Sequence, residues 1–559
     1  MVARNHRVSQ GVLLPQGLGS GLANQRILAA ANGTAFPSGP ARQAECARVL
    51  SEDASTWRTS YHKHHFRNLA LCASDHHVAT QVAQAGIDAA HACFQFISKD
   101  GATMSTQELI NRTVSSVRQG LGVEVFYTAT VKGDEDTASR VALRIPYRGE
   151  TLQGPQLMAL VDGWLAKGVI EASAGESLKG LAGEHAAWLD LRGKHFVVLG
   201  AGSQLGPTRT LLELGAVVHA VDLPRPATWR RLISAARGTR GELRFPVRER
   251  VAESATDDAL ADLAGADLLT QAPEVASWIC AQAPAETLCI GNYTYLDGAK
   301  FVRLAVAADV VQAVVCQVRP DTALALLCSP TECFAVPPEA RAAATRRYHQ
   351  WSLHSLWYAP TRVLSGSRYL EKNEPLEVQL DMRPAEGVEP MKGEVSSVYL
   401  QDSYVWTQGN NYAMAKQLQR WRALVARAGG HVVSANVGPA SLTHSVLHNR
   451  LVAAGMYGCQ HFGVEPFEVD TANYVMTALL IHDLCCTTSA AHPSTPLASP
   501  LMLFAENSAH GGVWRAAYKT NSVTEVAAVV FLLSAVRPYI LGLLAGAAVY
   551  NNYQHYSRL

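Results

Sequence analysis

The stretch HFVVLGAGSQLGPTRTLLELGAVVHAVDLP, residues 195–224, decides the fold. It reads as an apolar strand, a glycine turn, a helix and a second apolar strand, which is the pattern of a β-α-β unit. Strand-like runs at 286–292, 322–328 and 430–437 follow, with helical patterns between them. Strands that alternate with helices build a parallel sheet with helices on both faces. The sequence therefore predicts an α/β protein with a doubly wound parallel sheet.

The composition indicates a large folded protein and argues against nucleic-acid binding. The chain has 559 residues, 48% hydrophobic and 17% charged, which is enough apolar material for more than one core. Its 48 Lys and Arg residues against 47 Asp and Glu leave a formal charge of +1, so no positive field is available to collect phosphates. The 11 cysteines contain no CxxC pair and no zinc-ligand spacing. This cysteine usage predicts reduced thiols, an intracellular reducing compartment and no bound metal.

Composition divides the chain into four parts. Residues 1–40 lack acidic residues and carry Arg among Ser, Ala and Gly, which fits a plastid or mitochondrial transit peptide or a disordered tail of a cytoplasmic protein. Residues 41–190 read as mostly helical, and 191–490 as the doubly wound domain with an insertion at 335–395. Residues 491–559 read as a loop followed by an apolar helical segment.

The segment 526–549 within this last part is long and apolar enough to cross a bilayer once. Arg537 and Pro538 interrupt it, and a charge at mid-membrane costs about 2.5–3.5 kcal/mol on insertion scales. Gly542 and Gly546 form a GxxxG pattern that suits close helix packing. Three interpretations follow: two helices of the core, a membrane anchor or interfacial hairpin, or an oligomer contact.

The turn after the first strand contains Gly200, Gly202, Ser203 and Gly206, where a dinucleotide pyrophosphate could approach bare backbone and a helix N-terminus. Asp222 closes the second strand, at the place where a carboxylate accepts from the adenosine ribose hydroxyls. Three arginines follow it and would suit a 2′-phosphate, so that NAD and NADP are both possible: Arg225, Arg230 and Arg231. The alternative is an ordinary strand-to-helix turn with an incidental Asp.

Tyr412 and Lys416 of the segment YAMAK lie four residues apart and would share one face of a helix. An ammonium group beside a phenol would lower the phenol pKa from its ordinary value of about 10. A phenol tuned in this way can exchange a proton with a substrate oxygen. The simpler interpretation of this spacing alone is a surface pair.

In this order, the glycine turn, Asp222, YAMAK and GGHVVSANVGPASLT (429–443) resemble the short-chain dehydrogenase/reductase superfamily over about residues 193–485. The resemblance implies a Rossmann-type fold and NAD- or NADP-dependent chemistry on a carbonyl/alcohol pair of a small, apolar substrate. It implies that Tyr412 is the acid/base, with Lys416 beside it. It leaves two candidates for the serine that holds the substrate oxygen: Ser329 and Ser397. It also assigns three residues to the cofactor site: Asn292, Pro439 and Thr443.

The sequence departs from the family pattern at Leu199, Gln204 and Ala440, which stand where the family has Thr, Gly and Gly. A glutamine side chain at 204 would crowd a pyrophosphate. These departures suit an alternative function, a catalytically inactive structural or regulatory subunit with the same fold. Aromatic residues of the insertion and the loop 510–514 could wall an apolar substrate or simply pack in the core: Tyr348, Trp351, Trp357, Tyr358 and Trp514.

Overall fold

The computed structural model describes residues 10–73, 75–121, 126–134, 141–252, 254–350, 355–366, 368–380, 397–405 and 408–534. At its centre is a seven-stranded sheet with the order β15-β11-β10-β7-β8-β9-β4. The strands are β4 (Tyr127–Lys132), β7 (His195–Leu199), β8 (Val217–Val221), β9 (Glu242–Val247), β10 (Leu288–Asn292), β11 (Ala323–Leu326) and β15 (Val433–Ser434). All neighbours are parallel except β4, which pairs antiparallel with β9. The predicted α/β class with a mostly parallel sheet is confirmed.

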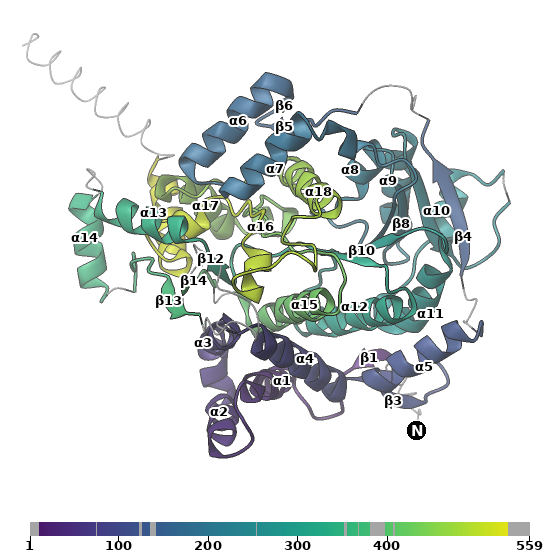
Figure 1. Ribbon diagram of the computed structural model, residues 1–559, viewed down its shortest axis with the longest axis horizontal. Coiled ribbons are helices and arrows are strands. Elements are labelled where there is room, and N and C mark those ends of the chain that lie inside the picture. The colour runs from purple at the N-terminus through teal and green to yellow at the C-terminus, as the bar shows by residue number, and fades with distance from the viewer. Residues whose placement is uncertain are drawn as a thin grey trace, which may run out of the picture.

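Helices cover both faces of this sheet (Figure 1). One face carries α11 (Leu268–Ala281), α12 (Ala299–Val318) and α15 (Asn410–Ala428). The other carries α8 (Thr208–Glu213), α9 (Pro226–Arg237), α10 (Asp257–Leu263) and α18 (Val469–Cys485). The central strands are rich in apolar residues because both faces are buried: on β7, Val197 and Leu199 face one core cluster, and Phe196 and Val198 face the other.

A second layer of helices lies outside each of these (Figure 1). Below α11, α12 and α15 lie α1 (Ser20–Thr34), α2 (Pro40–Leu50), α3 (Ala54–Ala73), α4 (His76–Cys93) and α5 (Thr106–Arg118), with β1 (Gly11–Leu13), β2 (Gln95–Ile97) and β3 (Thr103–Ser105). Above α18 lie α6 (Gly154–Lys167) and α7 (Ala172–Ala182), with β5 (Ile145–Tyr147) and β6 (Glu150–Leu152).

Two parts of the N-terminal half differ from expectation. The disordered-tail alternative for residues 1–40 is wrong for the part that the structure describes, because α1 buries Ile27, Leu28 and Ala31 in the core. Their three- and four-residue spacing forms an apolar stripe that the overall composition of the segment hides. The region expected to be mostly helical also supplies β4, in which Ala129 and Val131 alternate with exposed neighbours. β4 covers the edge of β9 and completes the sheet.

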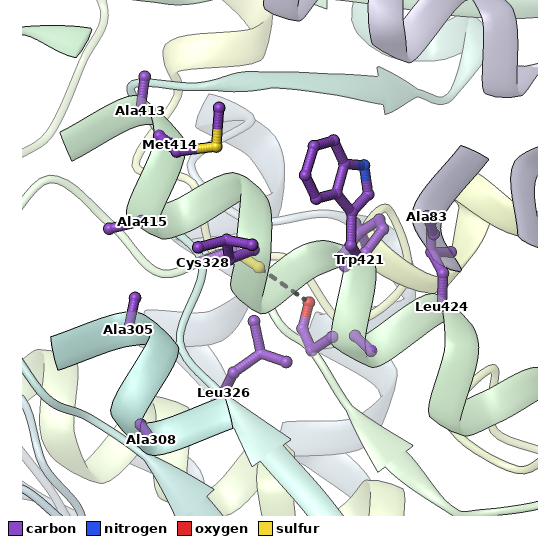
Figure 2. Close-up of a cluster of buried hydrophobic side chains, with 14 of the residues drawn as sticks. Ala83, Ala305, Ala308, Leu326, Cys328, Ala413, Met414, Ala415, Trp421 and Leu424 are labelled. Atoms are coloured by element: carbon purple, nitrogen blue, oxygen red, sulfur yellow. Dashed lines mark hydrogen bonds between the residues drawn. The ribbon is translucent and has the colours of Figure 1, made fainter. Parts of the chain in front are cut away.

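The helix α15 is held tightly between the sheet and the outer layer (Figure 2). Its Trp421 is fully buried and points toward α4, where a Cβ at Gly86 would come within 2.4 Å of the indole ring. Only a glycine leaves room for the indole at this point. On the sheet side, Cys328 Sγ donates to the Ala435 carbonyl at 3.6 Å and links the ends of β11 and β15. The packing fixes where the first turns of α15 lie relative to β11.

A buried ionic cluster of His91, Asp309 and Arg422 joins α4, α12 and α15. Both oxygens of Asp309 accept from the Arg422 guanidinium at 2.7 Å, and Oδ2 lies 2.8 Å from His91 Nε2. Burial alone would raise the pKa of Asp309, but the Arg422 charge and these hydrogen bonds outweigh it and hold that pKa well below its ordinary value. The carboxylate is therefore ionised inside the core and ties three helices together.

The insertion forms a separate antiparallel sheet with the order β12-β14-β13. Its elements are β12 (Cys333–Val336), α13 (Pro338–His349), α14 (Ser355–Leu364), β13 (Leu376–Gln379) and β14 (Ser397–Asp402). Trp514 is fully buried against Phe334 and His510, so this part of the expected substrate wall is core packing instead. Trp351 and the Trp357 side chain lie outside the described residues.

The C-terminal part contains α16 (His444–His448), α17 (Arg450–Gly458) and a helix at Thr520–Ser534. The remainder of the apolar segment, 535–549, lies outside the described residues. Among the described helices, α12 is long and apolar enough to cross a membrane, but 78% of its apolar window is buried within the protein. α12 therefore has the surroundings of a core helix.

Candidate active site

Three of the predicted catalytic residues come together beyond the carboxyl end of β11. Ser329 follows this strand and lies close to the phenol of Tyr412, which is in the first turn of α15, while its hydroxyl is hydrogen-bonded to Thr331 Oγ1 at 2.9 Å. Lys416 lies one turn further along the helix and donates to the Leu327 carbonyl at 3.0 Å and to Gln419 Oε1 at 3.2 Å. A hydroxyl, a phenol and an amine thus meet at one edge of the parallel sheet.

The surroundings of Tyr412 raise the pKa of its phenol above the ordinary value. Burial is the main cause, the negative charge of Glu332 adds to it, and the Ser329 hydroxyl opposes it only in part. The expectation that Lys416 lowers this pKa is wrong, because the amine bonds to Leu327 and Gln419. Tyr412 therefore holds its proton at neutral pH, as an ordinary tyrosine does, and its raised pKa makes it a weaker acid than a free tyrosine.

Glu332 and Arg420 support the turn that carries Ser329, and the sequence analysis missed both. Glu332 Oε1 accepts from the Ser329 backbone N–H at 3.1 Å, and its Oε2 lies 3.3 Å from Arg420 Nε. Arg420 also donates to the Cys333 carbonyl at 2.6 Å. The one signal in the sequence is that Arg420 follows Lys416 by four residues on α15, a spacing equally common on exposed helices.

Ser397, the other serine candidate, lies in a different sheet. It begins β14, pairs with Gln379 of β13 and hydrogen-bonds to Glu377. Its smaller sequence distance from Tyr412 is misleading, because the antiparallel sheet of the insertion takes up that part of the chain. The structure therefore places Ser329, and not Ser397, beside Tyr412.

The glycine turn follows β7, as predicted, but internal hydrogen bonds use several of its N–H groups. Gly200 has a φ of +80°, and a Cβ there would meet the Tyr293 carbonyl at 2.9 Å. The N–H of Ser203 donates to the Gly200 carbonyl at 2.9 Å, and that of Gly206 to the Ser203 carbonyl at 3.1 Å. α8 begins only after Pro207 and has six residues. These groups are not free to cradle a pyrophosphate in this conformation.

Asp222 lies at the end of β8, where a ribose-binding carboxylate was expected, but it closes the glycine turn. Its Oδ2 accepts from the Gly202 N–H at 2.7 Å and its Oδ1 from the Leu223 N–H at 2.8 Å. Burial raises the pKa of Asp222 above its ordinary value in spite of these bonds. Arg231 of α9 donates to the Gly202 carbonyl of this turn at 3.0 Å.

Gln204 connects the glycine turn to the opposite side of the sheet edge. Its Oε1 accepts from the His444 backbone N–H at 2.9 Å, at the start of α16. Its carbonyl accepts from Asn473 Nδ2 of α18 at 2.7 Å. We call the contact between the Gln204 side chain and His444 the Gln204 bridge. It spans the edge at which the strand order reverses between β7 and β10.

The space at this edge is almost filled. A cavity lined by Pro207, Tyr293, Leu327, Asn436 and Met476 has a volume of about 10 Å³, room for one water molecule at most. A larger hollow of about 690 Å³ lies on the surface of α2, remote from these residues. The size of this hollow does not by itself indicate a functional site, because its lining comes from α2 and the turn before that helix.

The remaining predicted cofactor residues lie at the same edge. Asn292 ends β10, accepts from the Thr294 hydroxyl at 2.8 Å, and has a buried Nδ2 without a hydrogen-bond partner among the described residues. Pro439 is buried in the loop after β15, and Thr443 precedes α16. Asn292 therefore offers a donor to a ligand, but the cavity is too small for a dinucleotide. The Gln204 bridge closes this edge of the sheet in the structure.

Models of known protein families, curated protein sequences and solved structures were all compared with this chain, and none matches it.

Proposed function

We propose that the chain is an NAD(P)-dependent oxidoreductase of the short-chain type that acts on a carbonyl/alcohol pair of an apolar substrate. The proximity of the Ser329 hydroxyl to the Tyr412 phenol, with Lys416 one turn away, is the observation that carries the proposal. The parallel strands, numbered along the chain, have the order 3-2-1-4-5-6, which is the order of Rossmann-type dinucleotide-binding sheets. Ligands of such sheets bind beyond the carboxyl ends of the strands, where these three residues lie.

The protonation state of Tyr412 favours reduction over oxidation. A phenol with a raised pKa holds its proton at neutral pH and can donate it to a carbonyl oxygen, while Ser329 holds the same oxygen. Phe301 and Tyr295 pack against the Tyr412 ring, with centroids 5.7 and 6.4 Å away, and give the site an apolar side. The Gln204 bridge has to open before a nucleotide enters.

A second candidate function is that of a structural or regulatory subunit without catalysis. The closed edge favours it, since the Gln204 bridge, the bonds of Asp222 and the cavity of about 10 Å³ together leave no room for a nucleotide. A measurement of nucleotide binding distinguishes the oxidoreductase from the non-catalytic subunit.

Opening the Gln204 bridge is expected to improve nucleotide binding. Gln204→Ala removes one hydrogen bond, worth about 1 kcal/mol, from the closed state alone and should tighten NADH or NADPH binding about fivefold. The affinity for NADH and NADPH is measured from cofactor fluorescence during titration of the purified full chain. Gln107→Ala on α5, whose side-chain amide donates to Asn111 Oδ1 at 3.3 Å, is the matched control and should leave the affinity unchanged. If neither the wild type nor Gln204→Ala binds either nucleotide at millimolar concentration, the second candidate function replaces the first.

A further inference from the structure

His510 holds together the tight turn formed by residues 509–512, which we call the His510 turn. The imidazole is fully buried; its Nδ1 accepts from the Gly512 backbone N–H at 3.0 Å, and its Nε2 lies 2.8 Å from Glu171 Oε1. Because Nδ1 is an acceptor, the one ring proton of the neutral imidazole is on Nε2 and is donated to Glu171. The ring also stacks on Trp514, with centroids 4.5 Å apart. The neutral form of His510 therefore satisfies both ring nitrogens.

The His510 turn supports residues 437–444, the segment that follows β15 and ends at the Gln204 bridge. The Ala509 N–H donates to the Val437 carbonyl at 2.9 Å, and a Cβ at Gly511 would lie 3.6 Å from Pro439 Cβ. The last residue of the segment donates its N–H in the Gln204 bridge. The turn that His510 holds is thus in contact with the part of the chain that closes the sheet edge.

Two charged groups face the His510 ring: Glu171, just before α7, and Arg515, just after the turn. Arg515 Nε donates to Glu171 Oε1 at 3.1 Å, so the carboxylate already has a cationic partner. Beyond these, Glu506 faces Glu171, and Arg347 faces Arg515. The ring is therefore enclosed by one carboxylate and one guanidinium that neutralise each other.

These surroundings keep His510 neutral and Glu171 ionised. Burial lowers the pKa of His510, and the Glu171 carboxylate opposes this only in part. Burial alone would raise the pKa of Glu171, but the hydrogen bonds and charges of His510 and Arg515 lower it to about 2. Glu171 consequently stays ionised in mild acid, where a released histidine gains a proton.

We propose that His510 is a pH-sensitive switch, whose protonation by solvent releases the His510 turn from residues 437–444 and loosens the Gln204 bridge. An imidazolium carries a proton on each nitrogen, so Nδ1 would oppose the Gly512 N–H instead of accepting from it. A released histidine has the ordinary pKa of about 6.5, whereas the pKa of the buried one is lowered. The contact is therefore fully present above about pH 6.5 and is weakened as pH falls below it.

Amide hydrogen exchange of the full-length protein tests the proposal, after correction for the intrinsic pH dependence of exchange. Between about pH 7.5 and pH 5, peptides covering 437–444 and 508–516 should lose protection about tenfold or more, because the released state binds an extra proton. Peptides from β7 and β8 should keep their protection. His510→Gln cannot titrate and should show no such pH dependence. His77→Gln on α4, an exposed histidine, is the matched control and should behave like the wild type.

Nuclear magnetic resonance of the 15N-labelled histidine rings provides a second measurement, on the wild-type turn itself. The His510 signal is assigned by the shift that Trp514→Phe causes in it, since the two rings are stacked. It should show the proton on Nε2 at neutral pH and should titrate over the pH range in which the two peptides lose protection.

Three outcomes would overturn the proposal. The first is a wild-type protein whose two peptides are equally protected at both pH values. The second is an equal loss of protection in His510→Gln and the wild type, which would assign the effect to another group such as Glu506. The third is a neutral His510 with its proton on Nδ1. The test needs no nucleotide, so its failure leaves the proposed oxidoreductase function untouched.

Discussion

Tyr412→Phe is expected to lower the turnover number for reduction of apolar ketones by about two to four orders of magnitude, the usual contribution of a general acid. The change removes only the phenolic oxygen, which lies close to Ser329. The turnover number is measured with a panel of ketones, from the absorbance change as NADH or NADPH is oxidised. Because the pKa of Tyr412 is raised, the wild-type reduction rate should be flat between about pH 6 and 9. Alcohol oxidation, which needs the ionised phenol, should rise with pH over that range.

Tyr295→Phe provides the control for this prediction. Tyr295 packs beside Tyr412, but its hydroxyl bonds to Asp297 at 2.8 Å. Loss of this hydroxyl should change turnover less than about threefold, because the ring that packs against Tyr412 is kept and the hydroxyl bonds to Asp297. Equal turnover in Tyr412→Phe and the wild type would remove Tyr412 from the chemistry. Unchanged nucleotide affinity in Tyr412→Phe would show that only the proton-transfer step is affected.

Asp309→Ala is expected to lower the free energy of unfolding by about 3–5 kcal/mol, because it leaves the buried Arg422 guanidinium without its partner. Urea denaturation followed by tryptophan fluorescence measures the change. Glu108→Ala breaks the exposed Glu108–Arg112 pair on α5 and should cost no more than about 0.5 kcal/mol. A loss for Asp309→Ala as small as that for Glu108→Ala would contradict a structural role for the buried cluster.

The contribution of Asp309 also has a defined pH dependence. Its folded-state pKa is lowered, so its stabilisation is fully present above the unfolded pKa of about 3.9 and is lost as pH falls toward the folded value. Asn at this position cannot ionise. The difference in unfolding free energy between the wild type and Asp309→Asn should therefore be largest near neutral pH and shrink below about pH 4.

Local patterns in the sequence predicted the strands and the turn well. The run from His195 to Pro224 contains its own strand, turn and strand signals, and the structure has β7, the glycine turn and β8 there. The YxxxK spacing likewise placed Tyr412 and Lys416 on one helix. What local patterns could not predict is which atoms these side chains meet. The Lys416 amine is directed by a carbonyl 89 residues away, at Leu327.

Long-range contacts account for the other differences. Gln204 and His444 are 240 residues apart, so the bridge that closes the sheet edge has no local signature. β4 joins the sheet from the N-terminal region because its alternating pattern fits the free edge of β9. Ser329 and Ser397 could not be distinguished from the sequence, because that choice depends on where the insertion folds its own sheet.

The Gln204 bridge ends at His444, the first residue of α16, and α16 leads directly into α17. The contact that closes the sheet edge is thus made at the start of a segment whose residues up to 452 are mostly exposed. Thermodynamic linkage makes any coupling through this contact reciprocal: a ligand that opens the Gln204 bridge by binding would itself be bound more tightly, by the same factor, once the bridge is open.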